Sequence, residues 1–454
     1  MPVNHPILSQ ALQIHPGDVI AFVGAGGKTT AMFDCAKSSI PCVVTTTTHL
    51  FETQAQNATR HIIALPGDDV SGHLEKLSPQ EVLLITGPLN PSNQRLTSPD
   101  DQQMMQLKSA CRQKNIPLFI EADGARTRSI KAPAKHEPAI PSYTTKVVVV
   151  AGMSAIGQPL SEDTTHRPEI FAQLAGMRIG ENVTPQYASA VLCHSLGGLK
   201  NIPISANKYL LLTQVDSIVA ASYAAQIGNL AISSYESVIL SNIKDGAVKI
   251  LSKKSKIAGV ILAAGKSQRL GRPKQLELFL GKPFVRRIAE TALAAGLFPV
   301  LVVTGKHHKQ IVDLLADLPV VCVKNPEWEQ GQGTSVAVGT HNLPTEIGAA
   351  IYMVCDQPQL EQELIESLIE EHQKRLSPVI VPMIAGKRSN PVLFGNQAFS
   401  ELAKLKGEAG GRQVFHQFQV EYLEWLDDLM ALDVDTEEDL VLLERLSRER
   451  GGMQ

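Results

Sequence analysis

The stretch 257-IAGVILAAGKSQRLGRPKQL-276 decides the fold of the second half of this 454-residue chain. Aliphatic residues run straight into small residues and a glycine, and four cations follow within ten positions, Lys266, Arg269, Arg272 and Lys274. An apolar run that ends in glycine predicts a strand followed by a tight turn. Ligands gather beyond the carboxyl ends of parallel strands, where helix N-termini present free N–H groups to anions. A lone glycine turn of this kind is more often a tight turn with solvated charges than an anion site, and the longer pattern of the stretch is what points to an anion site.

Short apolar runs alternate with helical spacings through the rest of the second half, as in 300-VLVVTG-305, 320-VVCV-323 and 378-PVIVP-382. This alternation predicts a mostly parallel sheet with helices on both faces. The first half opens in the same way with 19-VIAFVGAGGKTT-30, and the Lys-rich segment 244-KDGAVKILSKKSK-256 separates the halves. We therefore expect two α/β domains, residues 1–250 and 251–454.

Composition excludes several classes of protein. With 42 Lys+Arg against 45 Asp+Glu, the formal charge of -3 supplies no field that would hold a nucleic acid or an anionic membrane. The longest apolar stretches fall short of the roughly 18 residues that a spanning helix needs. Six cysteines without a CxxC pair argue against disulfides and a zinc ribbon. We expect a cytoplasmic protein with neither a nucleic acid nor a membrane as partner.

Two further segments predict chemistry in the second half. The strand 351-IYMVC-355 ends in Asp356, Gln357 and Pro358, which places a carboxylate at the edge of the sheet. Such a carboxylate binds magnesium, or it merely forms a turn before the proline. The loop 329-EQGQGTSVAVGT-340 carries Gly331 and Gly333, whose backbone groups we expect to face a base.

Four strings together resemble a known family: LAAGxSxRxGxxKxL, 386-GKRSNPVLFG-395, 404-KLKGEAGGRQV-414 and 432-LDVDTEEDL-440. They resemble the MocA-like molybdenum cofactor cytidylyltransferases, within the MobA-like NTP transferase family, over residues 257 to 446. The resemblance implies a Rossmann-like, GT-A-like nucleotidyltransferase domain. Ser389 departs from the glycine that often precedes Asn-Pro in this family, so the shape of the substrate loop stays open.

The resemblance also implies roles for individual residues. Arg269 and Lys274 look like triphosphate ligands, Asp356 like the principal Mg²⁺ ligand, and Asp435 or Asp433 like a second acidic contributor. Thr436 and Asp439 have the spacing of a capping box, so one of these aspartates serves either the metal or the helix. The nucleotide would contact Leu262, Ala263, Ala264, Gly265, Gly331, Gly333 and Ser335.

The family reaction transfers CMP from CTP to molybdenum-loaded molybdopterin, with release of pyrophosphate. A phosphate monoester with a second pKa of about 6 is largely a dianion at neutral pH, so no general base is required. Alignment and positive charge are what the protein must supply. GTP in place of CTP, or another phosphate acceptor, stays open because the sequence does not decide which base is bound.

The first half carries a shortened phosphate loop, in which Phe22 stands where the usual pattern has glycine. Either it is a tight turn, or it binds a nucleoside triphosphate with magnesium through Gly26, Gly27, Lys28 and Thr29. The strand of 116-IPLFIEADGA-125 ends in Glu121 and Asp123, and Asp123 is the expected metal contact. The basic run 126-RTRSIKAPAKHEP-138 is either an anion site or a solvated loop.

These strings, with 43-VVTTTTHLF-51 and 157-GQPLSEDTTHRPE-169, resemble the YqeC family over about residues 8 to 245. That resemblance implies a P-loop-like α/β accessory domain for selenium-dependent molybdenum hydroxylases. Our leading hypothesis is a bifunctional maturation protein that acts on CTP and molybdopterin and serves a molybdenum hydroxylase apoenzyme. The alternative is a non-catalytic chaperone that delivers cofactor under control of a bound nucleotide.

Overall fold

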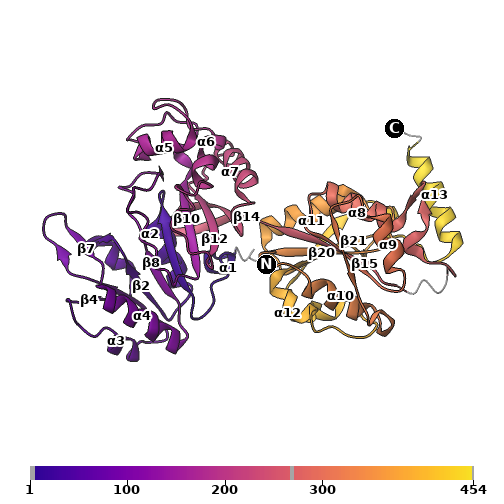
Figure 1. Cartoon of the computed structure of the whole chain (residues 1–454), viewed down its shortest axis with the longest axis horizontal. Helices are drawn as coiled ribbons and strands as arrows, with labels where there is room; N and C mark the ends of the chain where they lie inside the picture. Colours follow the sequence, from indigo (N-terminus) through magenta and orange to yellow (C-terminus); the bar gives the residue numbers. More distant parts are fainter. Residues whose placement is uncertain (1–5, 266–269, 452–454) are drawn as a thin grey trace. The chain divides into compact units, whose positions relative to one another are not determined.

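The computed structural model describes residues 6–265 and 270–451, and the chain divides into two compact units between Lys254 and Ser255 (Figure 1). Both units are α/β with mostly parallel sheets, so the predicted fold class is confirmed. The Lys-rich segment is not an extended linker. Asp245 and Gly246, both with positive φ, form a tight turn. The part of the Lys-rich segment after this turn pairs with the strand that precedes it.

The first unit is built on a nine-stranded sheet with the order β14-β13-β12-β10-β1-β8-β2-β5-β4. Strand β1 lies in the middle and pairs in parallel with β8 on one side and β10 on the other. The strands are β1 (Val19–Gly24), β2 (Cys42–Thr46), β4 (Arg60–Ile63), β5 (Val82–Thr86), β8 (Leu118–Glu121), β10 (Lys146–Gly152), β12 (Asn207–Thr213), β13 (Ser237–Lys244) and β14 (Ala247–Ser255).

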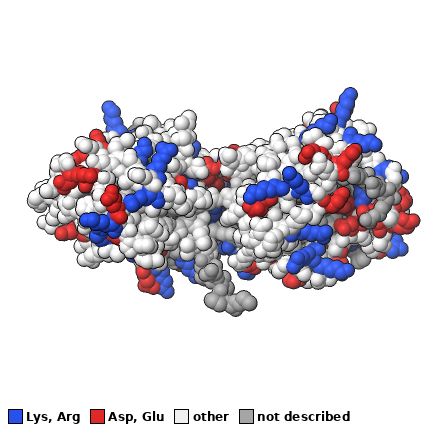
Figure 2. All heavy atoms as spheres, turned by 90° about the horizontal axis from the view of Figure 1, so that it is seen from below, with Lys and Arg blue, Asp and Glu red and all other residues white. Residues whose placement is uncertain are grey.

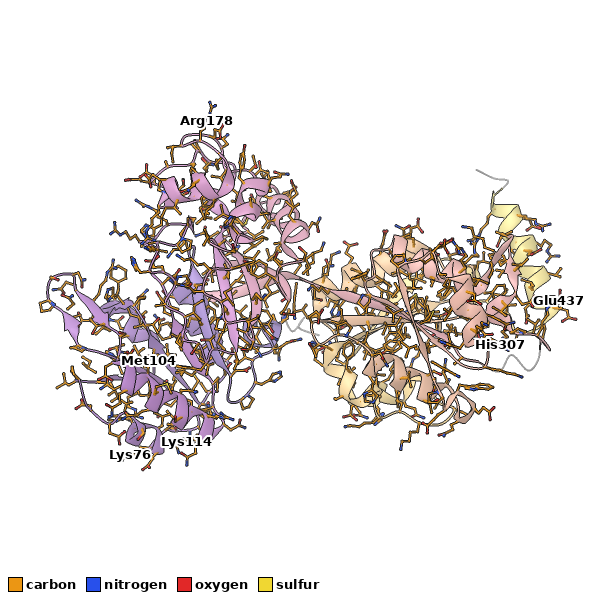
Figure 3. The ribbon with its side chains drawn as sticks, viewed as in Figure 1. Lys76, Met104, Lys114, Arg178, His307 and Glu437 are labelled. Atoms are coloured by element: carbon orange, nitrogen blue, oxygen red, sulfur yellow. The ribbon has the colours of Figure 1, made fainter. Side chains whose placement is uncertain are left out.

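Helices cover this sheet and enclose one large core. Met104, labelled in Figure 3, lies on α4 and packs in that core. Asp100 and Gln103 cap α4 reciprocally, which fixes its start. The helices are α1 (Leu8–Ala11), α2 (Lys28–Lys37), α3 (Ser71–Glu75), α4 (Asp101–Lys114), α5 (Pro168–Ala175), α6 (Pro185–Leu192) and α7 (Ile218–Ala231). One small sheet comprises β3 (His49–Phe51), β6 (Leu89–Asn90) and β7 (Arg95–Thr97), and another comprises β9 (Ile130–Lys131) and β11 (Thr165–His166).

The second unit is built on an eight-stranded sheet. Seven of its strands follow the order β19-β18-β15-β20-β23-β21-β22, and the eighth, β24, pairs with β21. Strand β23 runs antiparallel to β20, while β15 is parallel to both of its neighbours. The strands are β15 (Ile257–Ala263), β18 (Val300–Thr304), β19 (Val320–Lys324), β20 (Ala349–Val354), β21 (Val379–Ile384), β22 (Lys387–Arg388), β23 (Val392–Gly395) and β24 (Val420–Trp425), with a separate hairpin of β16 (Leu278–Phe279) and β17 (Lys282–Pro283).

Two apolar clusters form the core of the second unit. One gathers residues of α8, α11 and α13, and the other gathers residues of α10 and α12. The helices are α8 (Phe284–Ala294), α9 (His308–Leu314), α10 (Gln332–His341), α11 (Gln362–Arg375), α12 (Phe399–Leu402) and α13 (Glu437–Gly451). Because β15 and β20 are parallel neighbours, with Leu262 opposite Val354, the segments after both strands meet at one edge.

Charged side chains of both signs are interspersed on the face that Figure 2 shows. This distribution accords with the small formal charge of -3. Among the described residues, no helix has the length and apolar character that crossing a membrane requires. All six cysteines are unpaired thiols, as expected.

Candidate functional site

A pocket of about 380 Å³ lies at the carboxyl edge of β15 and β20 in the second unit. It contains most of the residues that the sequence predicted there. Its lining consists of Leu262, Ala264, Gly265, Lys274, Gln275, Trp328, Gly331, Gln332, Ser335, Val354, Cys355, Asp356, Glu408 and Asp435. The segments after two neighbouring strands thus meet the 3₁₀ turn η3 (Lys274–Leu276) and the segment before α13.

Lys274 lies between two carboxylates of this pocket. Its Nζ is ion-paired with Oδ1 of Asp435 and lies 4.0 Å from Oδ2 of Asp356. The other oxygen of Asp356, Oδ1, is buried and accepts no hydrogen bond from the described residues. The three side chains predicted to act together are therefore neighbours, although they come from segments up to 161 positions apart.

The environment of Asp356 opposes its negative charge. Burial, with a smaller contribution from the nearby charges of Asp433 and Asp435, raises the pKa of its carboxyl to about 6, although Lys274 acts to lower it. Carboxylates that crowd together in this way favour a cation among them. The raised pKa reflects first the burial of the carboxyl, and the lack of a donor to Oδ1 among the described residues adds to the cost of its charge.

The two aspartates before α13 have separate partners, and neither caps the helix. Asp439 accepts hydrogen bonds from the backbone N–H of Thr436 at 2.8 Å and of Asp435 at 3.0 Å, and Thr436 returns a bond to Asp439. The capping box is therefore complete without Asp433 or Asp435. Asp433 accepts from Nε2 of Gln357 at 2.8 Å, whereas Asp435 pairs with Lys274.

The glycine loop before α10 differs in part from the expectation. Gly331 lines the pocket, but Gly333 does not, and its N–H donates to the carbonyl of Gly407 at 2.8 Å. A Cβ on Gly331 would overlap that same carbonyl, and Gly331 has a φ of +119°. These glycines let two loops pack closely, and this packing brings Glu408 to the pocket wall.

Sequence inspection missed six lining residues, Gln275, Trp328, Gln332, Val354, Cys355 and Glu408. Each lies within or next to a segment in which we predicted site residues. Closeness in sequence to those residues was the signal that could have found them. Trp328 packs against Gly305, where a Cβ would come within 2.8 Å of the indole. An indole in a pocket wall offers a flat face on which a base or pterin ring can stack.

Besides Gly333, one described residue of the predicted set does not line the pocket, and one predicted residue is not described. Arg269 lies outside the described residues. Ala263 is a buried residue of β15 and is not part of the pocket wall. Ser335 lines the pocket, and its hydroxyl accepts from Nδ2 of the fully buried Asn325 at 3.0 Å.

Within residues 6–265 and 270–451, no three His, Cys, Asp or Glu side chains form a group that could hold a metal ion. The donor set still fits a hard divalent cation. Asp356 and Asp435 line one pocket, and Oδ1 of Asp356 accepts no hydrogen bond from any residue that the structure describes. Carboxylate oxygens are the ligands that Mg²⁺ prefers, and it commonly takes one or two of them together with substrate phosphates.

In the first unit, six buried or half-buried ionic side chains form a row of ion pairs in which acidic and basic groups alternate. The row runs in the order Glu121, Lys28, Asp123, Lys131, Glu137 and Arg167. Lys28 Nζ lies 3.5 Å from Glu121 and 2.5 Å from Asp123. Lys131 Nζ lies 2.8 Å from both Asp123 and Glu137. Arg167 completes the chain with two bonds to Glu137, of 2.7 and 2.9 Å. We call these six residues the ion chain.

The glycine loop of the first unit directs much of its backbone inward. The N–H of Gly24 donates to both carboxylate oxygens of Asp123, at 3.0 and 3.1 Å. Ala25 donates to Val150 and Gly26 to Arg128. Thr29 donates to Glu121 at 2.7 Å. The predicted residues Gly26, Lys28, Thr29 and Asp123 are thus brought together, and the Asp123 carboxylate accepts the bonds that a phosphate was expected to accept.

The other two segments of the first half also have clear partners. The hydroxyls of Thr45 and Thr46 donate to main-chain carbonyls of the neighbouring strands β5 and β8, and the hydroxyl of Thr47 donates to the carbonyl of Ala139. The basic run is divided: Lys131 is buried in the ion chain, whereas Arg126 is exposed. A solvated loop describes only part of that run.

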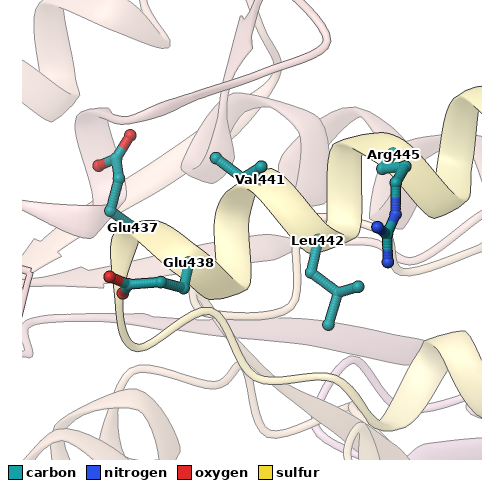
Figure 4. Close-up of a pocket in the computed structure, with 5 residues that line it drawn as sticks. All are labelled: Glu437, Glu438, Val441, Leu442 and Arg445. Atoms are coloured by element: carbon teal, nitrogen blue, oxygen red, sulfur yellow. The ribbon is translucent and has the colours of Figure 1, made fainter.

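A second hollow, of about 330 Å³, lies on α13 (Figure 4). Its lining comes from successive turns of that one helix, with Glu437 and Glu438 at the start and Arg445 two turns on. None of these described side chains has a buried polar atom without a partner. The pocket beside β15 is therefore the better candidate site.

Two protein families match the chain. Residues 20–169 match the family described as YqeC protein, and residues 259–422 match the MobA-like NTP transferase domain. The chain joins a YqeC domain to a MobA-like NTP transferase domain. The ion chain and the glycine loop beside it thus belong to the YqeC domain, and the pocket beside β15 belongs to the transferase domain.

Curated relatives support both assignments. The uncharacterized protein YqeC of Escherichia coli K12 is 28% identical over 46% of this chain and 81% of its own length. Nicotine blue oxidoreductase of Paenarthrobacter nicotinovorans is 31% identical over 41% of this chain and 96% of its own length. A probable molybdenum cofactor guanylyltransferase of Bacillus cereus AH187 is 28% identical over 43% of this chain and all of its own length.

Among solved structures, Rv0371c of Mycobacterium tuberculosis H37Rv aligns with a TM-score of 0.38 and 27% identity. The alignment covers 42% of this chain and 98% of that one.

Proposed function

We propose that the MobA-like domain is a molybdenum cofactor cytidylyltransferase, which transfers CMP from CTP to molybdenum-loaded molybdopterin and releases pyrophosphate. One observation carries the proposal. Lys274, Asp356 and Asp435 converge in a pocket of about 380 Å³ at the carboxyl edge of a parallel sheet, and Asp356 has an unpaired buried oxygen there. Such a pocket suits a nucleotide whose phosphates arrive with a cation.

The proposed reaction needs alignment more than acid–base chemistry. The terminal phosphate of molybdopterin is largely dianionic at neutral pH, because its second pKa is about 6. It attacks the α-phosphorus of the triphosphate, and the bond to the β-phosphate oxygen breaks, so that pyrophosphate departs with the electron pair. Lys274 neutralises charge on the phosphates, and the pocket wall holds the two anions in line.

Asp356 and Asp435 would hold the proposed Mg²⁺. When bound, that ion supplies positive charge for the phosphate oxygens. Lys274 pairs with Asp435 in the ligand-free pocket. We propose that Lys274 moves from this carboxylate toward the phosphates when the nucleotide binds, which frees Asp435 to join Asp356.

The choice of CTP rests on the resemblance of the sequence strings to the MocA-like enzymes. GTP is the second candidate, because a probable molybdenum cofactor guanylyltransferase is 28% identical over its full length. Trp328 offers a stacking face to either base, so the protein's own geometry is compatible with both.

We propose that the YqeC domain is a nucleotide-binding accessory module for maturation of a molybdenum hydroxylase. Support comes from the approach of Lys28, Thr29 and Asp123 behind a glycine loop. A nucleotide with Mg²⁺ would have to exchange partners with this cluster, since Lys28 is already paired. The six unpaired cysteines fit the reducing cytoplasm as the compartment.

Turnover tests the proposed reaction directly. The full chain is incubated with molybdenum-loaded molybdopterin, Mg²⁺ and either CTP or GTP, and pyrophosphate and the cofactor product are measured. We expect pyrophosphate and cytidylated cofactor from CTP alone. Turnover with GTP alone would make the protein a guanylyltransferase. Turnover with neither nucleotide would contradict catalysis and favour a nucleotide-controlled chaperone.

A further inference from the structure

The pocket of the MobA-like domain contains a glutamine whose side-chain oxygen has no hydrogen-bond partner among the residues that the structure describes. Gln275 follows Lys274 in the turn η3 and is 3% exposed. Its Nε2 donates to the backbone carbonyl of Gly265 at 3.0 Å. Its Oε1 is buried and accepts no hydrogen bond from the described residues.

The orientation of this amide follows from its one contact. If the amide were reversed, Oε1 would face the Gly265 carbonyl, and two acceptors would meet without a proton between them. Nε2 must therefore face Gly265, which leaves Oε1 as the free acceptor. A buried acceptor without a donor loses its hydration and gains nothing in return, so such a group calls for an explanation.

Gln359 shows that an unpaired amide oxygen alone does not mark a site. Its Nε2 also donates to backbone carbonyls, of Leu429 at 2.9 Å and Leu432 at 2.7 Å, and its Oε1 is also buried and unpaired. Gln359 is outside the pocket lining, whereas Gln275 is part of it. Within the described part of the chain, the pocket therefore offers to one ligand two acceptors that have no partner, Oε1 of Gln275 and Oδ1 of Asp356.

We infer that Oε1 of Gln275 accepts a hydrogen bond from an O–H group of the bound nucleotide complex. This inference rests on the proposed function. Gln275 shares the pocket with Lys274 and Asp356, at the proposed cation and phosphate end. Ionised phosphates offer only acceptors, so the donors at hand are ribose hydroxyls and waters on the divalent cation. Both are O–H groups, and they make Gln275 a ligand-binding residue for nucleotide or cation.

Calorimetric titration of the full chain distinguishes the two sources. The probes are Mn²⁺ alone, CTP with Mg²⁺, and 2′,3′-dideoxy-CTP with Mg²⁺. Gln275→Met has nearly the shape of glutamine but no acceptor, and Gln359→Met is the matched control outside the pocket. We expect Gln275→Met to lose 10- to 100-fold in affinity for Mn²⁺ alone if a cation-bound water is the donor. If a ribose hydroxyl is the donor, the variant loses the wild-type preference for CTP over 2′,3′-dideoxy-CTP. Gln359→Met should bind all three probes as the wild type does.

Unchanged affinities of Gln275→Met for Mn²⁺ and CTP, with the preference over 2′,3′-dideoxy-CTP intact, would overturn the inference while the proposed function stands. Equal losses in Gln275→Met and Gln359→Met would also overturn it, because general packing would then explain both. A wild-type chain that binds no nucleotide would overturn the proposed function as well. If Gln275→Met fails to fold, Gln275→Asn withdraws the oxygen by one methylene and should weaken binding of the same probe.

Discussion

At the scale of single residues, the transferase pocket is marked by carboxylates that have little positive charge near them. Asp356 is held near Asp433 and Asp435, and Lys274 is the one described cation in the pocket lining. Burial and like charge raise the pKa of the Asp356 carboxyl to about 6. An ionised Asp356 therefore disfavours folding at neutral pH, because the unfolded chain holds the same charge more readily. A residue that costs stability and has an unpaired buried oxygen is a strong candidate for function.

Replacement of Asp356 by Asn tests that role. We expect nucleotidyl transfer to fall at least about 100-fold, since one charged contact with the cation and phosphates is lost. We also expect the melting temperature to stay the same or rise, because repulsion from Asp433 and Asp435 is relieved. Pyrophosphate release and thermal melting are measured on the same sample. A folded Asp356→Asn protein with full turnover would remove this residue from the mechanism.

At the scale of elements, close loop packing and buried ion pairs hold the two candidate sites. In the transferase domain, the loop before α10 packs against residues 406–408 through Gly331 and Gly333. In the YqeC domain, the ion chain links the start of α2 and the end of β8 to the segment before α5. Each arrangement fixes the positions of polar groups. A single substitution in either one should lower the free energy of unfolding.

Gly331→Ala should disturb the pocket wall. The new Cβ would overlap the Gly407 carbonyl at a φ that alanine rarely adopts, so we expect a loss of about 2–4 kcal/mol in the free energy of unfolding. Gly407→Ala is the control, because Gly407 also has a positive φ but has open space around its Cβ position. That variant should lose about 1–2 kcal/mol. Equal losses in urea denaturation would show that loop packing is not the reason for the glycine.

Lys131→Met should break the ion chain in its middle. The substitution leaves Asp123 and Glu137 without a shared cation, and removal of one partner from a buried pair costs about 3–5 kcal/mol. Lys374→Met removes an exposed pair with Glu370 and should cost at most about 1 kcal/mol. Denaturant unfolding of the full chain measures the loss for Lys131→Met in the YqeC domain and the loss for Lys374→Met in the transferase domain. A change below about 1 kcal/mol for Lys131→Met would mean that the ion chain contributes little to folding.

At the scale of the whole molecule, each unit has its own core, and the YqeC unit should be sensitive to acid. Burial raises the pKa of Glu137, but Arg167 and Lys131 outweigh it and lower that pKa to about 2. Burial, together with Arg167 and Lys131, lowers the pKa of His166 to about 4. Glu137 therefore stabilises the fold above the ordinary carboxyl range and loses this contribution toward pH 2. His166 remains neutral when folded, so protonation of the unfolded chain below pH 6.5 also favours unfolding.

We expect the stability of the YqeC unit to fall steadily as the pH drops from about 6.5 to 2. Glu137→Gln should flatten the part of this dependence between about pH 4.5 and 2, a span worth on the order of 3 kcal/mol. Urea unfolding at a series of pH values measures both curves. Parallel curves for the wild type and Glu137→Gln would contradict the assignment.

The sequence predicted local features well and distant partners poorly. The turns after β1 and β15 follow from strand patterns, whereas the convergence of Lys274 with Asp356 was an expectation that the family resemblance implied. The pairing of Lys131 with Asp123 and Glu137 did not follow, because a basic run resembles a solvated loop until its neighbours are known. The packing role of Gly333 depends on a loop more than 70 positions away. Sheet order and loop contacts, which local periodicity does not encode, decide these features.

The most direct test of the central claim is a crystal structure of the full chain with Mg²⁺ and a non-hydrolysable CTP analogue. The account predicts the triphosphate in the pocket beside β15, with Lys274 on the phosphates and the cation on Asp356. An analogue bound elsewhere in the chain, with Lys274 still paired to Asp435 and Asp356 without a ligand, would contradict it.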